Sequence, residues 1–200
     1  MALQRKFLGS RWSWAALLAV LLAAWFVVGR SRPTGSAVPY VALKPAANGI
    51  EHPDFRGVWQ LDLEASDSLV PILEAKGRNV IEQTLAANIP ITHTIDIQDE
   101  REMIIKIGTP IFTKVERMLF DGSPLESIDL EGNHVEAKST WSDDGQTIVT
   151  NVRGKAPGDN VTCTIRRSLT DKRQTMYVDL DYRFSAEQQF EIRRIFRRVK

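Results

Sequence analysis

The sequence predicts a mainly β protein, an up-and-down antiparallel barrel of ten strands with a two-helix lid after the first strand. Two observations predict this fold. Almost every segment after Pro90 alternates apolar with polar residues, and turn sequences such as Asp121-Gly122 separate most of these segments. A meander of that many hairpins closes best into a barrel, because closure removes its exposed edge strands. The 200 residues leave room for this one domain and an N-terminal appendage.

The individual elements follow from the apolar pattern. The first strand is expected at residues 58–63. Ser66 is the expected cap of a first helix, Gly77 ends that helix, and a second helix runs from Val80 to Asn88. Helices of two or three turns are marginal alone, so we expect them to pack as a lid on the open end of the barrel. Nine further strands are expected at residues 91–97, 103–108, 111–119, 127–130, 135–141, 147–153, 161–169, 175–184 and 190–199.

The charge of the chain is balanced overall but unevenly distributed. Its 26 basic and 25 acidic residues give a net charge of +1. The first 44 residues carry six basic groups and no acid, so the remainder is net acidic, which argues against a nucleic-acid-binding domain. The single Cys163 excludes an internal disulfide and any multi-cysteine metal site.

The N-terminal segment reads as a membrane anchor. Residues 12–29 form an uncharged apolar run at the short end of what spans a bilayer, with tryptophans near its ends. We therefore expect an anchor at residues 1–32 and a flexible tether at residues 33–54. More basic groups precede the run than follow it, which favours a single-pass signal-anchor with its N-terminus in the cytosol. Cleavage as a signal peptide near Gly35-Ser36-Ala37 is the alternative, and a buried globular helix fits less well because the run has no polar face.

Strand parity places two arginines on apolar faces. In residues 161–169, Arg167 shares its face with Cys163 and Ile165, because alternate residues of a strand point to opposite sides. In the last strand, Arg194 shares its face with Phe196. Guanidinium groups in an apolar interior need a partner, and a ligand carboxylate would supply one. Pairing with buried acids or ordered water is the alternative.

Short motifs recur in order along residues 55–200. They are Phe55-x-Gly57-x-Trp59 at the start, Lys76-Gly77 between the helices, Pro90 before the second strand, Arg167-x-Leu169-x-Asp171, and Arg194-x-Phe196 in the last strand. With the order of one strand, two helices and nine hairpin strands, these motifs make residues 55–200 resemble the intracellular fatty-acid-binding protein family, which includes retinoid-binding members. Lipocalins also share a Gly-x-Trp opening but lack the early helix pair.

The resemblance implies a binding site and a mode of ligand recognition. In this family, arginines at the matching positions hold the carboxylate of a fatty acid or retinoic acid together with a tyrosine hydroxyl. Phe196 stands where that tyrosine is expected, which removes one hydrogen bond and leaves the two arginines. The predicted ligand-binding residues are Arg167, Arg194, Phe196, Ile165 and Cys163.

The sequence thus predicts a non-enzymatic, monomeric, membrane-tethered carrier of a long-chain carboxylate. No cofactor or metal is expected, because His52, His93 and His134 are scattered and no nucleophile or nucleotide motif appears. One alternative is a tethered assembly module whose barrel is filled by its own side chains, namely Trp59, Phe112, Phe120, Phe190 and Phe196. Another is a lipid-acting enzyme such as an isomerase, although no acid/base pair stands out.

Overall fold

The computed structural model describes residues 51–99, 101–128, 133–154, 161–170 and 172–199. The predicted anchor at residues 1–32, and the predicted tether as far as residue 50, lie outside these residues. Neither helix in the described part of the chain is long and apolar enough to cross a membrane.

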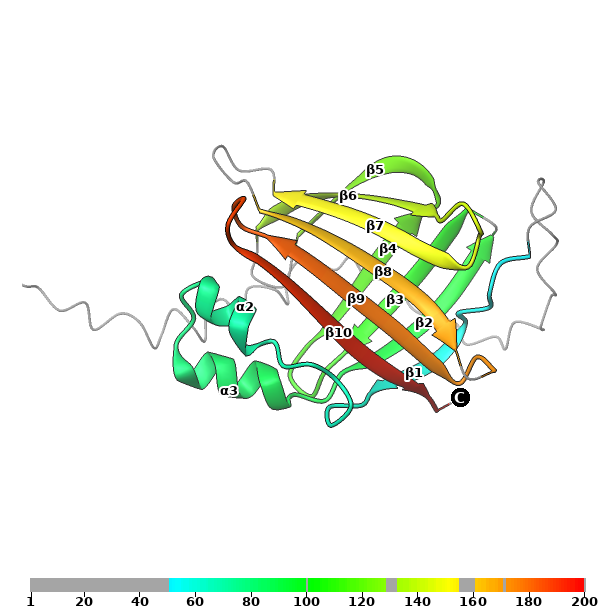
Figure 1. Ribbon diagram of the computed structural model, residues 1–200. Coiled ribbons are helices and arrows are strands. Elements are labelled where there is room, and N and C mark those ends of the chain that lie inside the picture. The colour runs from blue at the N-terminus through cyan, green and yellow to red at the C-terminus, as the bar shows by residue number, and fades with distance from the viewer. Residues whose placement is uncertain (1–50, 100, 129–132, 155–160, 171, 200) are drawn as a thin grey trace, which may run out of the picture. The chain divides into compact units, whose positions relative to one another are not determined.

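Ten antiparallel strands form one sheet that curves into a nearly closed barrel (Figure 1). They are β1 (Gly57–Leu61), β2 (Thr92–Asp99), β3 (Glu102–Gly108), β4 (Thr113–Leu119), β5 (Asp121–Ile128), β6 (His134–Trp141), β7 (Thr147–Gly154), β8 (Thr162–Thr170), β9 (Thr175–Arg183) and β10 (Gln189–Arg198). The spatial order is β4-β3-β2-β1-β10-β9-β8-β7-β6-β5, so β1 pairs with β10 and most other strands pair with their sequence neighbours. This order confirms the predicted meander and the predicted lid position after β1.

The barrel is not fully closed, contrary to the prediction. β4 and β5 stand at the two ends of the strand order, and no backbone ladder joins these two fully described strands. Pro124 in β5 has no N–H to donate, and the β5–β6 register shifts between Asp121 and Pro124. Strand β5 also begins earlier than predicted, because Asp121 and Gly122 belong to the strand, with Gly122 at a φ of 77°.

The helices begin and end through local capping. α2 (Val70–Ala75) has Leu69 as its N-cap, so the predicted cap at Ser66 is wrong. The Ser66 hydroxyl instead donates to the Asp62 carbonyl at 2.6 Å and accepts from the Ile195 amide at 2.9 Å, a partner far away in sequence. Gly77, at a φ of 69°, ends α2 as predicted.

The second helix is held by its cap rather than by packing. α3 (Val80–Asn88) starts with a capping box in which the Asn79 side chain accepts from the backbone while Glu82 reaches back to the Asn79 amide at 3.1 Å. Its apolar residues Val80 and Ile81 are 74% and 68% exposed. The expectation that this apolar face packs against the barrel is therefore wrong. Both helices lie at the same end of the barrel in Figure 1.

The opposite end of the barrel is filled by aromatic side chains. Trp59 and Phe55 are fully buried, and the Trp59 indole donates to the Phe55 carbonyl at 2.8 Å. His52 stacks on Trp141 with ring centroids 4.0 Å apart, so residues 51–54, which we placed in the tether, lie against this closed end. Arg198 lies 4.2 Å from the Trp59 ring centroid, a favourable cation–π contact.

Replacing Trp59 by alanine should destabilise the barrel strongly. The Trp59→Ala cavity would lower the free energy of unfolding by about 3–5 kcal/mol, as truncation of a buried tryptophan does. Denaturant unfolding followed by circular dichroism measures this change. Val80→Ala is the matched control and should change the free energy by less than about 0.5 kcal/mol, because Val80 is exposed. Equal effects of the two substitutions would contradict the closed-end role of Trp59.

Candidate functional site

The two predicted arginines lie in one row across three strands. Arg167 of β8 is opposite Val178 of β9, and Val178 is opposite Arg194 of β10. Residues that face each other across a ladder point to the same side of the sheet, and Val178 is buried, so both guanidiniums point into the barrel. Two strand spacings separate their backbones, about 10 Å, which both long side chains can bridge toward one ligand.

Arg167 is a buried cation without an ionic partner among the described residues. It is 4% exposed, its Nε has no hydrogen-bond partner, and its Nη1 lies 4.0 Å from the Met118 sulfur. The negative charge of Glu116 raises the pKa of Arg167, but Glu116 is itself paired with Lys114 at 2.8 Å. Burial lowers the pKa of Arg167, yet an arginine stays protonated in proteins. An anion in the barrel would relieve this uncompensated charge.

Arg194 is held by the segment that leads into the lid. It is 6% exposed, its Nη1 donates to the Asp67 carbonyl at 2.5 Å, and its Nη2 has no partner. Asp67 is itself fixed to β10, because its carboxylate accepts from the Arg193 amide at 2.7 Å. One half of the Arg194 guanidinium is therefore fixed and the other half is free to bind a ligand.

Arg198 shows what a structural arginine looks like in the same barrel. Its Nε, Nη1 and Nη2 donate to the carbonyls of Arg173, Arg56 and Asp54 at 2.9, 2.5 and 3.1 Å. Burial lowers its pKa while Asp54 opposes the shift. The contrast with Arg167 and Arg194 matters because buried polar groups are normally satisfied, and the exceptions call for a reason.

The other predicted site residues also face the interior. Phe196 is 3% exposed, and Ile165 lies one row toward the lid from Arg167, packed against the core. Cys163 lies another row toward the lid, opposite Tyr182. Tyr182 stands below the lid, where the Lys76 ammonium lies 5.6 Å from its ring centroid. The structure thus places all five residues on one inner face, and their role in binding stays a prediction.

Sequence reasoning missed His93. This β2 residue is 7% exposed, its ring stacks on Phe196 with centroids 4.3 Å apart, and its Nδ1 has no partner. The signal was present, since His93 alternates in phase with Ile91, Ile95 and Ile97. The metal-ligand spacing that the three histidines lack says nothing about a single inward-facing histidine. Among the described residues, no group of histidine, cysteine and acidic side chains could hold a metal ion.

Burial of the inner face differs on the two sides of the arginine row. Ile148 lies opposite Arg167, and Met176 lies beyond the arginines toward the closed end. Both side chains are fully buried. Ile165, Leu180 and Tyr182 point inward on the lid side but are only partly buried. Cys163 and Ile192, also inward on the lid side, are buried, so the inner wall there is apolar and of mixed burial.

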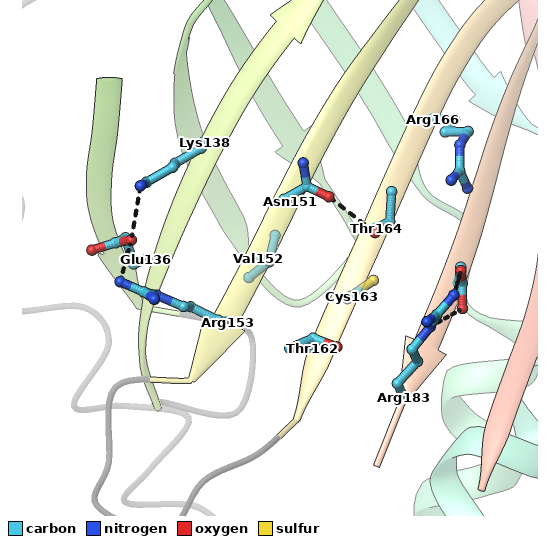
Figure 2. A pocket seen from close by; sticks show the side chains of 11 residues that line it. Glu136, Lys138, Asn151, Val152, Arg153, Thr162, Cys163, Thr164, Arg166 and Arg183 are labelled. Atoms are coloured by element: carbon cyan, nitrogen blue, oxygen red, sulfur yellow. Dashed lines mark hydrogen bonds and ion pairs between the residues drawn. The ribbon is translucent and has the colours of Figure 1, made fainter. Parts of the chain in front are cut away.

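A separate pocket of about 380 Å³ lies over the outer surface of β6–β9 (Figure 2). Two ion pairs lie in its lining: Glu136 pairs with Arg153 at 2.9 Å, and Asp181 pairs with Arg183 at 3.0 Å. Lys138 and Arg166 also line it, so the basic side chains outnumber the acidic ones. It is lined by outward residues such as Thr164 and is open to solvent. Arg167 and Arg194 do not line this pocket.

Comparisons with known structures give the fold a name. A fatty acid transporter described as REP1-NXSQ superposes with a TM-score of 0.60 and 19% identity, covering 74% of this chain and 97% of that one. The Echinococcus granulosus fatty-acid-binding protein 1 gives a TM-score of 0.60 at 11% identity, covering 73% and 98%. The chain has the fold of the fatty-acid-binding proteins.

A third structure with this fold contains a ligand. The Schistosoma mansoni fatty acid binding protein, in complex with arachidonic acid, gives a TM-score of 0.59 at 14% identity and covers 73% of this chain and 96% of that one. The sequence itself matches no protein-family model and no curated protein. At identities this low, the superpositions establish the fatty-acid-binding protein fold alone. The function must be argued from the site.

Cys163 should be unreactive in the folded protein. Burial raises the pKa of its thiol to about 12, with a neighbouring Tyr182 hydroxyl acting in the opposite direction. The thiolate is the reactive form, so at pH 8 its fraction is about a thousandfold lower than for an ordinary cysteine. Labelling by a thiol-specific reagent, followed by absorbance, should be slow in the native chain and fast in guanidinium chloride. Equal rates in the two states would show that the thiol is accessible.

Proposed function

We propose that this protein binds a long-chain carboxylate, such as a fatty acid or a retinoid-like lipid, inside its barrel and carries it without catalysis. One observation carries the proposal: Arg167 and Arg194 face the same apolar interior in one row, and each has a buried guanidinium nitrogen without a partner. The fold shared with fatty-acid-binding proteins, one of them in complex with arachidonic acid, supports the same ligand class.

The chemistry of the inner face suits a carboxylate with an apolar tail. A guanidinium recognises a carboxylate through two parallel hydrogen bonds, and these are strongest away from water. The wall on the lid side offers aliphatic and aromatic contacts from Ile165, Leu180 and Tyr182. No inward-facing acid and base are poised for proton transfer in the described barrel, since Glu116 is engaged by Lys114. Binding is therefore the activity that these residues support.

The N-terminal segment adds a location to this function. Its uncharged apolar run would tether the barrel as a single-pass anchor, with the N-terminus in the cytosol. A tether keeps the monomeric carrier close to the bilayer in which its ligand partitions, and so raises the local concentration of the ligand.

Removing either arginine should weaken carboxylate binding selectively. Arg167→Ala and Arg194→Ala should each make the free energy of binding less favourable by about 1.5–3 kcal/mol, the scale of a hydrogen bond to a charged group. Binding of the matching long-chain alcohol should change much less. Arg166→Ala is the matched control, because Arg166 is adjacent in β8 and points outward. Equal losses for acid and alcohol would indicate damage to the fold instead.

A direct titration tests the function as a whole. Delipidated residues 45–200 are titrated with a fluorescent long-chain fatty acid beside the Arg167→Ala/Arg194→Ala double variant. Saturable one-to-one binding that collapses in the double variant is the expected result. A well-folded wild type that does not bind would reject the carrier and favour the tethered assembly module with a filled interior.

A further inference from the structure

His93 lies inside the barrel on the closed-end side of the arginine row, in the row of Trp59 and Arg198. It is opposite Trp59 of β1 and Ile107 of β3, both buried, and its ring stacks on Phe196 of β10. Its Nδ1 has no hydrogen-bond partner although the side chain is more than nine-tenths buried. A buried polar atom left unpaired destabilises the folded protein, so its presence needs a reason.

The electrostatic surroundings of His93 are cationic. Burial and the charge of Arg167 lower the pKa of the imidazole to about 3, so it is neutral near pH 7. β1 and β3 present Trp59 and Ile107 to it, and β10 contributes Phe196, on which it stacks. Arg198 of β10 lies opposite Trp59 in the same row. On the inner face of β4, Lys114 and Glu116 form an ion pair. Arg167 is thus the dominant charge acting on His93.

Resting on the function proposed above, we propose that His93 is a third binding group for the anionic headgroup and takes up a proton from solvent when the anion binds. Burial is the main cause that keeps the imidazole neutral, and an anion between Arg167 and Arg194 compensates the second cause, the charge of Arg167. The free Nδ1 can then donate a hydrogen bond to a headgroup oxygen, with both ring nitrogens protonated. Phe196, on which the imidazole stacks, has no hydroxyl to serve that purpose.

This assignment makes the affinity depend on pH with a definite sign. The complex binds one proton more than the free protein at pH values between the pKa of His93 in the free state and its higher pKa in the complex. Lowering the pH through this window therefore strengthens binding by up to about tenfold per pH unit. Above the pKa of the complex, the affinity should be independent of pH.

The test uses the full chain in phosphatidylcholine nanodiscs and the probe 1-anilinonaphthalene-8-sulfonate. The sulfonate stays ionised from pH 5 to 8, so any proton taken up belongs to the protein. Fluorescence titrations, referenced to empty nanodiscs, compare the wild type with His93→Gln. His134→Gln is the matched control, because His134 is exposed. We expect the wild type and His134→Gln to bind more tightly as the pH falls, and His93→Gln to bind more weakly than the wild type with no pH dependence.

If His93→Gln does not fold, a second measurement on the wild type tests whether His93 takes up a proton when the probe binds. The ¹³Cε1 resonances of the labelled histidines are followed against pH with and without the probe, and the His93 titration should move to higher pH when the probe is bound. An unchanged titration, or the same pH dependence in His93→Gln as in the wild type, would overturn the role of His93. If Arg167→Ala still weakens binding in that case, the carrier function stands. If the wild type binds neither the probe nor a fatty acid, both proposals fail.

Discussion

The uncompensated charge of Arg167 is the constraint on which the interior of this barrel depends. A cation that is 4% exposed and has no acid of its own is costly, because burial removes its hydration without replacing it. The protein could satisfy such a group, as the three carbonyls around Arg198 demonstrate at the closed end. Among the described residues, Arg167 Nε and Arg194 Nη2 are left without such partners, and the proposed binding of an anion rests on this contrast.

The depth of the arginine row determines where the rest of a ligand can go. Toward the closed end, Trp59 and Met176 are fully buried and leave no accessible wall. Toward the lid, the row of Cys163 and Tyr182 lies four residues along the strand from Arg167, about 14 Å at the rise of an extended chain. A headgroup bound as proposed above would therefore have its tail toward the lid, where Ile165 and Leu180 line the inner face.

The sequence predicted best those features that depend on neighbouring residues within one strand or helix. The parity of β8 and β10 alone placed Arg167 and Arg194 on the inner face, because alternate residues must face opposite sides. The cap at Ser66 was wrong because its hydroxyl is engaged by Ile195, a contact that no local pattern reveals. The gap between β4 and β5 depends on a ladder between strands and cannot be read from either strand alone. His93 shared the parity of apolar neighbours, but its importance follows only from Arg167, which lies far away in sequence.

The lid and the site are joined through one segment of backbone. Arg194 donates to the Asp67 carbonyl, and the Asp67 carboxylate accepts from the neighbouring amide of Arg193, so the chain entering α2 is attached to the strand that carries the guanidinium. α3 has no buried residue, and its cap rather than its packing keeps it helical. The lid is thus anchored firmly near Arg194 and loosely beyond it. On the function proposed above, an anion bound by Arg194 would therefore act on the lid through this anchored segment.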